Sequence, residues 1–518
     1  MTKKIILVIL DGFGLAPPTK GNPITSRTAP FINGLITSYP SLSLVASGLS
    51  VGMPWGTFGN SEVGHSAMGT GRIVVQELAR INQEIRTGNF PKNPAFVKVL
   101  EHAKKNKSRV HLIGCVSPGG IHSHENHLLG LLELFGGHRG INVFVHMITD
   151  GEDSSPREAP ESLKRLKKPL AKAGAKISTI GGRVYAMDRI GNWELVKKAW
   201  DVMVEGSGKT IEDPEKYLKE SYGEGLIDSE ITPAVVSGAK DGTIRDNDGI
   251  VFFNFRNDRM RQIVSSFTDS KFNYFEQKNK PKNLCVATMT RYSDDFPVFV
   301  AYEPNIVPNA LGGVLSGLGL KQLRVAEQEK EAHVTNFFNG GKISPYAGEE
   351  RVIVSSRPLV GKGYVEHPEM SADKITEAVV GSVEKDYSLV VANFANTDMI
   401  GHTGDLEATR KAVGIIDECV KRICRSCDES GCLAIVTSDH GNAEELIDPL
   451  TGGKDTQHSV SGVPIVFVSR GLAMKSKIRG IERLAEEEPR GSLVDVAPSI
   501  LYFLGINKPE EMTGSLLL

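Results

Sequence analysis

The sequence has no apolar run near the roughly 18 residues that a membrane-spanning helix needs. Its first apolar run, Ile5–Leu10, stops at Asp11, short of the roughly 7–15 residues of a secretion signal, and no small-residue cleavage site follows. A large net charge is also lacking, because the formal value is -2 in 518 residues, so nucleic acid and anionic membranes are not expected as main partners. Internal repeats and low-complexity segments are absent too. We expect a cytoplasmic protein.

Cysteine is scarce, at six residues, but four of them lie close together: Cys419, Cys424, Cys427 and Cys432. Cysteine pairs at such spacing can bind zinc. The segment Ala412–Asp428 is expected to be a helix that spreads the thiols over different faces. We therefore expect reduced, partly buried thiols, with a zinc site as the alternative.

Short apolar, β-branched runs alternate with helical stretches, which indicates an α/β fold of βαβ units. The expected strands are Ile5–Leu10, Val110–Cys115, Asn142–Thr149, Lys176–Ile180, Gly249–Phe255, Leu389–Asn393, Leu433–Thr437 and Val463–Val468. The expected helices are Gln76–Arg86, Val97–Lys105, His127–Phe135, Glu158–Ala173, Trp193–Val204, Asp405–Cys424 and Leu493–Leu504. The length favours two domains, with a linker near Tyr302–Pro308. Spacing alone leaves open whether the domains are consecutive or one is inserted in the other.

Ser61 lies in a glycine-dense run, Gly48–Gly71, which we expect to be a loop. Small neighbours leave its hydroxyl uncovered, and glycine allows close approach to a ligand. Ser61 is therefore a candidate nucleophile, and the alternative is a serine that only caps a turn.

Carboxylate and imidazole side chains follow several expected strands. Asp398 and His402 are four residues apart, so that in a helix they share one face. The full candidate set is Asp11, Asp398, His402, Asp439, His440 and His458. Any one pair could be a capping Asp and a packed His, but together they favour a two-metal site for Mn, Zn, Fe or Co. Two ions can lower the pKa of a serine hydroxyl and neutralise a transferring phosphoryl group, which Ser61 would carry covalently.

The middle of the chain supplies anion-binding chemistry. Four arginines lie near the ends of two expected strands: Arg183, Arg189, Arg256 and Arg259. Guanidinium groups bind phosphate or carboxylate through two hydrogen bonds, so in a chain of near-zero charge they suggest a small anionic substrate. Each arginine alone could instead be a surface or salt-bridge residue.

Two further candidates follow strands in the same region. His122 is expected to contact a phosphate, although His122-Ser123-His124 with His127 could form another metal site. Asp153 could take a proton from a substrate hydroxyl, or could be a turn residue before Ser154-Ser155-Pro156.

Taken in order, these segments resemble the cofactor-independent (2,3-bisphosphoglycerate-independent) phosphoglycerate mutases of the alkaline phosphatase superfamily. The matching motifs span nearly the whole chain: Leu10-Asp11-Gly12, Gly59-Asn60-Ser61-Glu62-Val63-Gly64-His65, Gly120-Ile121-His122-Ser123-His124, Tyr185-Ala186-Met187-Asp188-Arg189, Asn254-Phe255-Arg256-Asn257-Asp258-Arg259, Glu329-Lys330, Asn393-Phe394-Ala395-Asn396, Gly401-His402-Thr403-Gly404, Asp439-His440-Gly441-Asn442 and His458.

The resemblance implies an alkaline-phosphatase-like, metal-binding domain of residues 1–76 and 308–518, with an inserted α/β transferase domain of residues 80–302 that binds substrate. It implies one Mn2+ on Asp398, His402 and His458, and a second on Asp11, Ser61, Asp439 and His440. Mg2+, Co2+ or Zn2+ are the alternatives, and 2,3-bisphosphoglycerate is not needed. It implies transfer of the phosphoryl group of 3-phosphoglycerate to Ser61 and back to the 2-hydroxyl, in glycolysis and gluconeogenesis, by a monomer. The implied substrate contacts are His122, Asp153, Arg183, Arg189, Arg256, Arg259 and Lys330.

Two positions depart from the family pattern. Glu152 stands in Asp150-Gly151-Glu152-Asp153 where the family usually has an arginine, and Glu331 follows Lys330 where an aromatic residue is common. Beside an anionic substrate, Glu152 should weaken binding unless it turns away or another cation compensates. Two alternatives to a mutase are therefore a metal-dependent phosphomonoester hydrolase and a binding protein that kept the fold without turnover.

Overall fold

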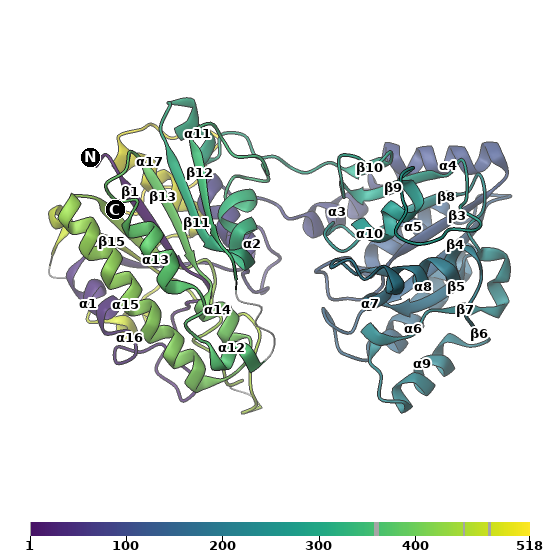
Figure 1. Cartoon of the computed structure of the whole chain (residues 1–518), viewed down its shortest axis with the longest axis horizontal. Coiled ribbons are helices and arrows are strands. Elements are labelled where there is room, and N and C mark those ends of the chain that lie inside the picture. The colour runs from purple at the N-terminus through teal and green to yellow at the C-terminus, as the bar shows by residue number, and fades with distance from the viewer. Residues whose placement is uncertain (1, 357–361, 449–450, 475–477) are drawn as a thin grey trace. The chain divides into compact units, whose positions relative to one another are not determined.

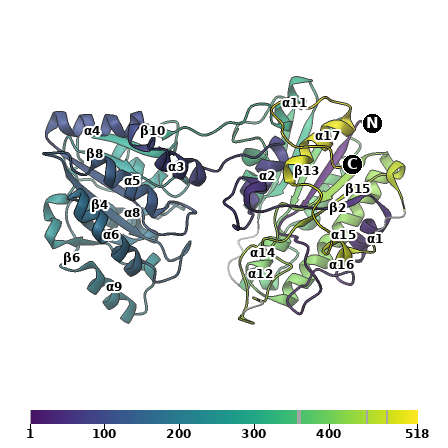
Figure 2. The ribbon, with the colours of Figure 1, turned by 180° about the vertical axis from the view of Figure 1, so that it is seen from behind.

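The structure is a computed structural model that describes residues 2–356, 362–448, 451–474 and 478–518. The chain forms two compact units, and the second interrupts the first in sequence (Figures 1 and 2). Unit 1 consists of Met1–Gln76 and Asn305–Leu518, and unit 2 of Glu77–Pro304. Each unit is built around its own mostly parallel sheet. The predicted α/β fold class with an inserted α/β domain is confirmed, and within the described residues no helix is both long and apolar enough to cross a membrane.

Unit 1 contains a seven-stranded sheet in the order β12-β11-β13-β1-β14-β15-β2. Its strands are β1 (Ile5–Leu10), β2 (Ser41–Leu44), β11 (Gln322–Glu327), β12 (Glu349–Val354), β13 (Leu389–Phe394), β14 (Leu433–Thr437) and β15 (Val463–Val468). β15 runs antiparallel to both of its neighbours, while the other paired strands are parallel. The carboxyl ends of β13, β1 and β14 therefore meet at one edge of the sheet.

Strand β1 is buried along its whole length because helices cover both faces of the sheet (Figure 1). Ile6, Val8 and Leu10 enter one core, and Ile5, Leu7 and Ile9 enter the other. Helices α1 (Pro30–Ser38), α13 (Ala372–Val380), α15 (Leu406–Ser430) and α16 (Ile481–Leu484) line the first core. Helices α2 (Ser61–Thr70), α11 (Leu311–Gly317) and α17 (Val496–Leu504) line the second. A continuous apolar run is typical of such a doubly covered strand.

Unit 2 contains an eight-stranded sheet in the order β10-β9-β8-β3-β4-β5-β7-β6. Its strands are β3 (Arg109–Cys115), β4 (Asn142–Thr149), β5 (Lys176–Gly182), β6 (Lys209–Ile211), β7 (Ala234–Val236), β8 (Gly249–Phe252), β9 (Cys285–Thr290) and β10 (Phe299–Tyr302). One core includes α3 (Glu77–Arg86), α4 (Pro94–Asn106), α5 (Glu125–Phe135), α6 (Ala159–Ala173) and α9 (Pro214–Gly223). The other includes α7 (Arg183–Ala186), α8 (Trp193–Val204) and α10 (Arg261–Thr268).

All eight predicted strands are present, and the largest error in a predicted extent is in β8. β8 ends at Phe252 rather than at Phe255. Beyond it, the side chain of Asn254 accepts a hydrogen bond from the backbone N–H of Cys115, and the N–H of Phe255 donates to the carbonyl of His122. The backbone thus leaves the sheet to join the loop after β3.

The expectation for the cysteines also needs correction. Cys419, Cys424, Cys427 and Cys432 are all buried in the same core of unit 1. Helix α15 directs the first three inward instead of spreading them over different faces, and Cys432 follows the end of the helix. Burial raises the pKa of the Cys424 thiol to about 12. Among the described residues, none of the side-chain sets close enough to share a metal ion contains a cysteine.

Candidate active site

The candidate metal ligands of unit 1 gather at the carboxyl edge of its sheet. Asp11 directly follows β1, and Asp439 and His440 follow β14. Asp398 lies in the short helix α14 (Asn396–Gly401), which begins two residues after β13 ends. All four side chains are buried, so three neighbouring strands carry them to one place.

The prediction that Ser61 lies in a loop is wrong, because Ser61 is the first residue of helix α2. The side chain of Asn60 caps this helix by accepting a hydrogen bond of 3.0 Å from the N–H of Val63. The glycines there serve close packing: a Cβ on Gly64 would lie 2.4 Å from the carbonyl oxygen of Asp439. The start of α2 therefore sits directly against the end of β14, and Ser61 is 6% exposed.

The Ser61 hydroxyl is surrounded by groups of both charges. Its Oγ lies 3.1 Å from Asp11 Oδ1 and 3.1 Å from His440 Nε2. The ammonium of Lys330 donates a hydrogen bond of 2.7 Å to Ser61 Oγ, one of 2.7 Å to Asp11 Oδ1 and one of 2.8 Å to Asp398 Oδ2. Lys330 thus belongs to unit 1 and links two carboxylates to the serine.

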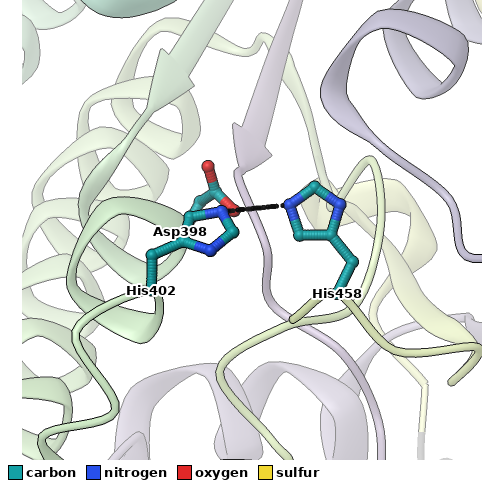
Figure 3. Close-up of side chains that lie close together, drawn as sticks. All are labelled: Asp398, His402 and His458. Atoms are coloured by element: carbon teal, nitrogen blue, oxygen red, sulfur yellow. Dashed lines mark hydrogen bonds and ion pairs between the residues drawn. The ribbon is translucent and has the colours of Figure 1, made fainter. Parts of the chain in front are cut away.

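A second group surrounds the other oxygen of Asp398 (Figure 3). Asp398 Oδ1 lies 3.3 Å from His402 Nε2 and 3.4 Å from His458 Nε2. The other ring nitrogens face backbone carbonyls, Nδ1 of His402 that of Thr456 and Nδ1 of His458 that of Gly59. Each Nδ1 therefore faces a carbonyl to which it can donate, and Nε2 is the ring nitrogen that each histidine presents to Asp398.

The charges at this edge shift one another's pKa values. Burial opposes ionisation of Asp398, but the ammonium of Lys330 and hydrogen bonds from His402 and His458 lower its pKa well below the usual range. Burial alone would likewise lower the pKa of His440, yet the carboxylates of Asp439, Asp11 and Asp398 raise it to about 10. The Asp398 carboxylate is therefore ionised at neutral pH, as a metal ligand must be.

Three sets of side chains bring their donor atoms within 4.8 Å of one another. They are Asp398-His402-His458, Asp11-Asp398-His440 and Asp11-His65-Asp439. Carboxylate oxygens with imidazole nitrogens form a donor set that suits divalent transition metals. The residues present therefore fit metal binding at this edge, and the predicted ligands other than Ser61 all occur in these sets.

In unit 2, His122, Asp153 and Arg183 form a compact group. His122 Nδ1 and Asp153 Oδ2 are 2.6 Å apart, and Arg183 Nη1 lies 3.0 Å from the same oxygen. Burial raises the pKa of Asp153, but the hydrogen bond from His122 and the charge of Arg183 outweigh burial and lower it. Arg183 is itself buried and also donates a hydrogen bond of 2.6 Å to Asp150.

The remaining arginines lie around Asp258 and Glu152. Asp258 is 2.9 Å from Arg189, 3.7 Å from Arg256 and 3.8 Å from His122. Glu152 Oε2 lies 3.5 Å from Arg183 Nη2 and 3.9 Å from Arg259 Nη2. All six predicted substrate residues of unit 2 therefore belong to one chain of ion pairs, and Glu152 faces the arginines.

Several residues of these clusters were not predicted. His65, Asn393 and Asp258 lie inside recognised motifs, but one sequence gives no reason to single out a motif's other polar residues. Conversely, among the described residues the metal-compatible sets do not include His122, His124 or His127. The alternative of a third metal site there finds no support.

The fold and these clusters define a class of α/β protein in which one unit carries side-chain sets suited to divalent metal ions. The family model described as BPG-independent PGAM N-terminus matches residues 81–294. Proteins named 2,3-bisphosphoglycerate-independent phosphoglycerate mutase from Nostoc sp. (strain PCC 7120) and Clostridium beijerinckii are each 42% identical, covering 99% and 100% of this chain and 95% and 99% of their own. A solved phosphoglycerate mutase of Leishmania mexicana, at low cobalt concentration, is 29% identical with a TM-score of 0.80, covering 99% of this chain and 97% of its own. The chain belongs to the 2,3-bisphosphoglycerate-independent phosphoglycerate mutase family, as its motifs predicted.

Proposed function

We propose that this chain interconverts 3-phosphoglycerate and 2-phosphoglycerate, with Ser61 as the transient carrier of the phosphoryl group. The names of its relatives favour this isomerase over the alternative hydrolase. The observation that carries the mechanism is the position of Ser61 Oγ, within 3.1 Å of Asp11 and His440 and 2.7 Å from Lys330.

The surroundings of Ser61 suit a group that gains negative charge. Ser61 begins a ten-residue helix, whose N-terminal N–H groups and dipole favour an anion. Lys330 adds a full positive charge at the hydroxyl itself. In the first step the Ser61 hydroxyl loses its proton and Oγ bonds to phosphorus, while the bond from phosphorus to the 3-oxygen of glycerate breaks and the 3-oxygen takes up a proton. In the second step the 2-hydroxyl loses its proton and its oxygen bonds to phosphorus, while the Oγ–P bond breaks and Oγ takes up a proton.

We propose that two Mn2+ ions bind at this sheet edge. Asp398, His402 and His458 would hold one, and Asp11, Asp439 and His440 with Ser61 would hold the other. Such ions lower the pKa of a serine hydroxyl and neutralise charge on the transferring group. Mg2+, Co2+ and Zn2+ are the alternatives, and the convergent carboxylates and imidazoles support any of them.

We assign substrate binding to the ion-pair cluster of unit 2. The guanidinium groups of Arg183, Arg189, Arg256 and Arg259 would bind the carboxylate and phosphate of the substrate. Asp153 would exchange a proton with the reacting hydroxyl, and its hydrogen bond from His122 supports this role by orienting the carboxylate. Lys330 would contact the phosphoryl group from unit 1. Under this proposal, residues 1–76 and 308–518 form the metal-binding domain and 80–302 the substrate domain.

The test is to incubate the chain with 3-phosphoglycerate and Mn2+ and to follow phosphorus by NMR. We expect 2-phosphoglycerate without free phosphate, and an acid-quenched sample should carry phosphate on the peptide containing Ser61. The Ser61→Ala variant should bind Mn2+ and lose both signals. Free phosphate in place of 2-phosphoglycerate would establish the hydrolase, and binding without turnover would establish the non-catalytic alternative. The monomeric state and the cytoplasmic location stay predictions.

A further inference from the structure

His65 and Asn393 form a buried hydrogen-bonded pair beside Ser61 to which the proposed mechanism gives no role. His65 lies on α2, four residues after Ser61, and Asn393 lies in β13. Both side chains are fully buried. The pair therefore connects the helix that begins at Ser61 to the strand beside β1.

The hydrogen-bond partners fix the orientation of the Asn393 amide. Asn393 Nδ2 lies 2.7 Å from Asp11 Oδ2, and an ionised carboxylate only accepts hydrogen bonds. The amide must therefore present its NH2 group to Asp11. The same nitrogen lies 3.1 Å from His65 Nε2, so its second hydrogen points to that ring nitrogen.

This orientation also fixes the tautomer of His65. Because Nε2 accepts from Asn393, the proton of a neutral ring sits on Nδ1. Nδ1 lies 2.8 Å from the carbonyl oxygen of Ser61 and 3.2 Å from Asp439 Oδ2, both of which only accept. A continuous series of hydrogen bonds thus joins the Ser61 carbonyl, His65, Asn393 and Asp11, and Asp439 Oδ2 lies beside its first donor.

We infer that His65 and Asn393 are positioning residues that hold Asp11 and the backbone of Ser61 in place, beside Asp439, for metal binding and phosphoryl transfer. His65 meets the distance criterion for a metal ligand together with Asp11 and Asp439. However, its Nδ1 carries a proton and its Nε2 lone pair is engaged by Asn393, so neither nitrogen is free to bind an ion. His65 therefore orients ligands without being one, a role whose loss typically costs roughly 10- to 100-fold in metal affinity.

This inference rests on the proposed function for the identity of the ligands, so its test measures Mn2+ binding without substrate. Mn2+ alone is titrated into the full metal-depleted chain, and free Mn2+ is followed by its electron paramagnetic resonance signal. His65→Phe and the nearly isosteric Asn393→Leu should bind as many ions as the wild type, with affinity roughly 10- to 100-fold lower. kcat should fall while KM stays close to the wild-type value.

Two further variants separate positioning from packing. The amide nitrogen of asparagine is bonded to Cγ, as Nδ1 of histidine is, so His65→Asn keeps an N–H donor at that position. It should therefore retain more Mn2+ affinity than His65→Phe. It also serves where the larger ring prevents folding, which circular dichroism would reveal. His127→Phe removes another buried histidine, from unit 2, and should leave Mn2+ binding unchanged.

Four results would overturn the inference. A variant that binds one ion fewer would make His65 a ligand. Variants with a lower melting temperature but wild-type Mn2+ affinity and kcat would make the pair a packing feature. A wild-type chain that binds no Mn2+ would overturn the proposed Mn2+ sites and this inference with them, whereas equal binding by the wild type and all variants would overturn the inference alone.

Discussion

Replacing Lys330 by Met should destabilise unit 1 strongly when divalent metal is removed. The ammonium is buried and hydrogen-bonded to Asp11 at 2.7 Å and to Asp398 at 2.8 Å. Methionine keeps the length of the side chain but leaves two buried carboxylates without this counter-charge. Removing one partner of a buried ion pair typically costs about 3–5 kcal/mol, and we expect a loss of that size.

Metal should offset part of this loss. A ligand that binds only the folded state stabilises it by about 2.7 kcal/mol at a concentration of 100 times its Kd. Cations that bind Asp11 and Asp398 replace the missing ammonium, so Mn2+ should stabilise Lys330→Met more than it stabilises the wild type. The defect should therefore be largest in EDTA and smaller in Mn2+.

Hydrogen exchange measured by mass spectrometry reports on unit 1 alone, through the β1 peptide Ile5–Leu10. Lys342→Met is the matched control, because this half-buried side chain hydrogen-bonds to Ser344 and lies over the ring of Tyr346, so its loss strands no buried carboxylate. Its effect should stay within about 1 kcal/mol. The reasoning would be refuted if, in EDTA, the amides of β1 exchanged no faster in Lys330→Met than in Lys342→Met.

Three further predictions use other parts of the structure. Glu152→Gln should lower KM for phosphoglycerate by up to about fivefold at unchanged kcat, because it removes a partly exposed carboxylate beside Arg183. The decrease in KM should be smaller at high salt, and an unchanged KM at low salt would contradict the prediction. Burial and the charge of His124 lower the pKa of His127 to about 3, so between pH 6.5 and 3 only the unfolded chain binds this proton and stability falls as pH falls. In His127→Phe, the free energy of unfolding of unit 2, measured with urea, should depend less steeply on pH over that window, by about 1.4 kcal/mol per pH unit. A pH dependence equal to that of the wild type would contradict this prediction. Gly64→Ala should cost about 1–3 kcal/mol in unit 1, since its Cβ would lie 2.4 Å from the Asp439 carbonyl, and a stability equal to wild type would show that the helix can shift.

The sequence predicted elements whose local pattern matches their environment. β1 was predictable because a strand covered on both faces needs six consecutive apolar residues, and Asp11 at its end marked the ligand edge. β11 was missed because its buried residues include Gln322 and Arg324. The Arg324 guanidinium donates a hydrogen bond of 2.6 Å to Gln322 and packs over Phe338, partners that no local pattern reveals.

The candidate site divides in the same way. Metal-ligand types at strand ends can be read from a sequence, because parallel strands deliver their ends to one edge. The charge balance of unit 2 cannot be read from the sequence, because Glu152 and Asp258 pair with arginines up to 107 residues away in the chain. Glu152 and Arg259 are the pair with that separation. Glu152 in particular reads as a defect in sequence, yet in the structure it completes an ion-pair chain with Arg183 and Arg259.

The glycines around Ser61 show most clearly where local reasoning fails. Glycine in a helix interior costs about 1 kcal/mol relative to alanine, so a segment with several glycines is predicted as a loop. In α2 the missing Cβ atoms let the helix approach other backbone closely: a Cβ on Gly69 would lie 1.9 Å from the carbonyl of Phe338, and one on Gly64 2.4 Å from that of Asp439. The same composition that argues against a helix is therefore what allows this helix to bring Ser61 against the end of β14. Only the tertiary contact distinguishes the two interpretations, because the unfavourable propensity and the favourable packing arise from the same absent atom.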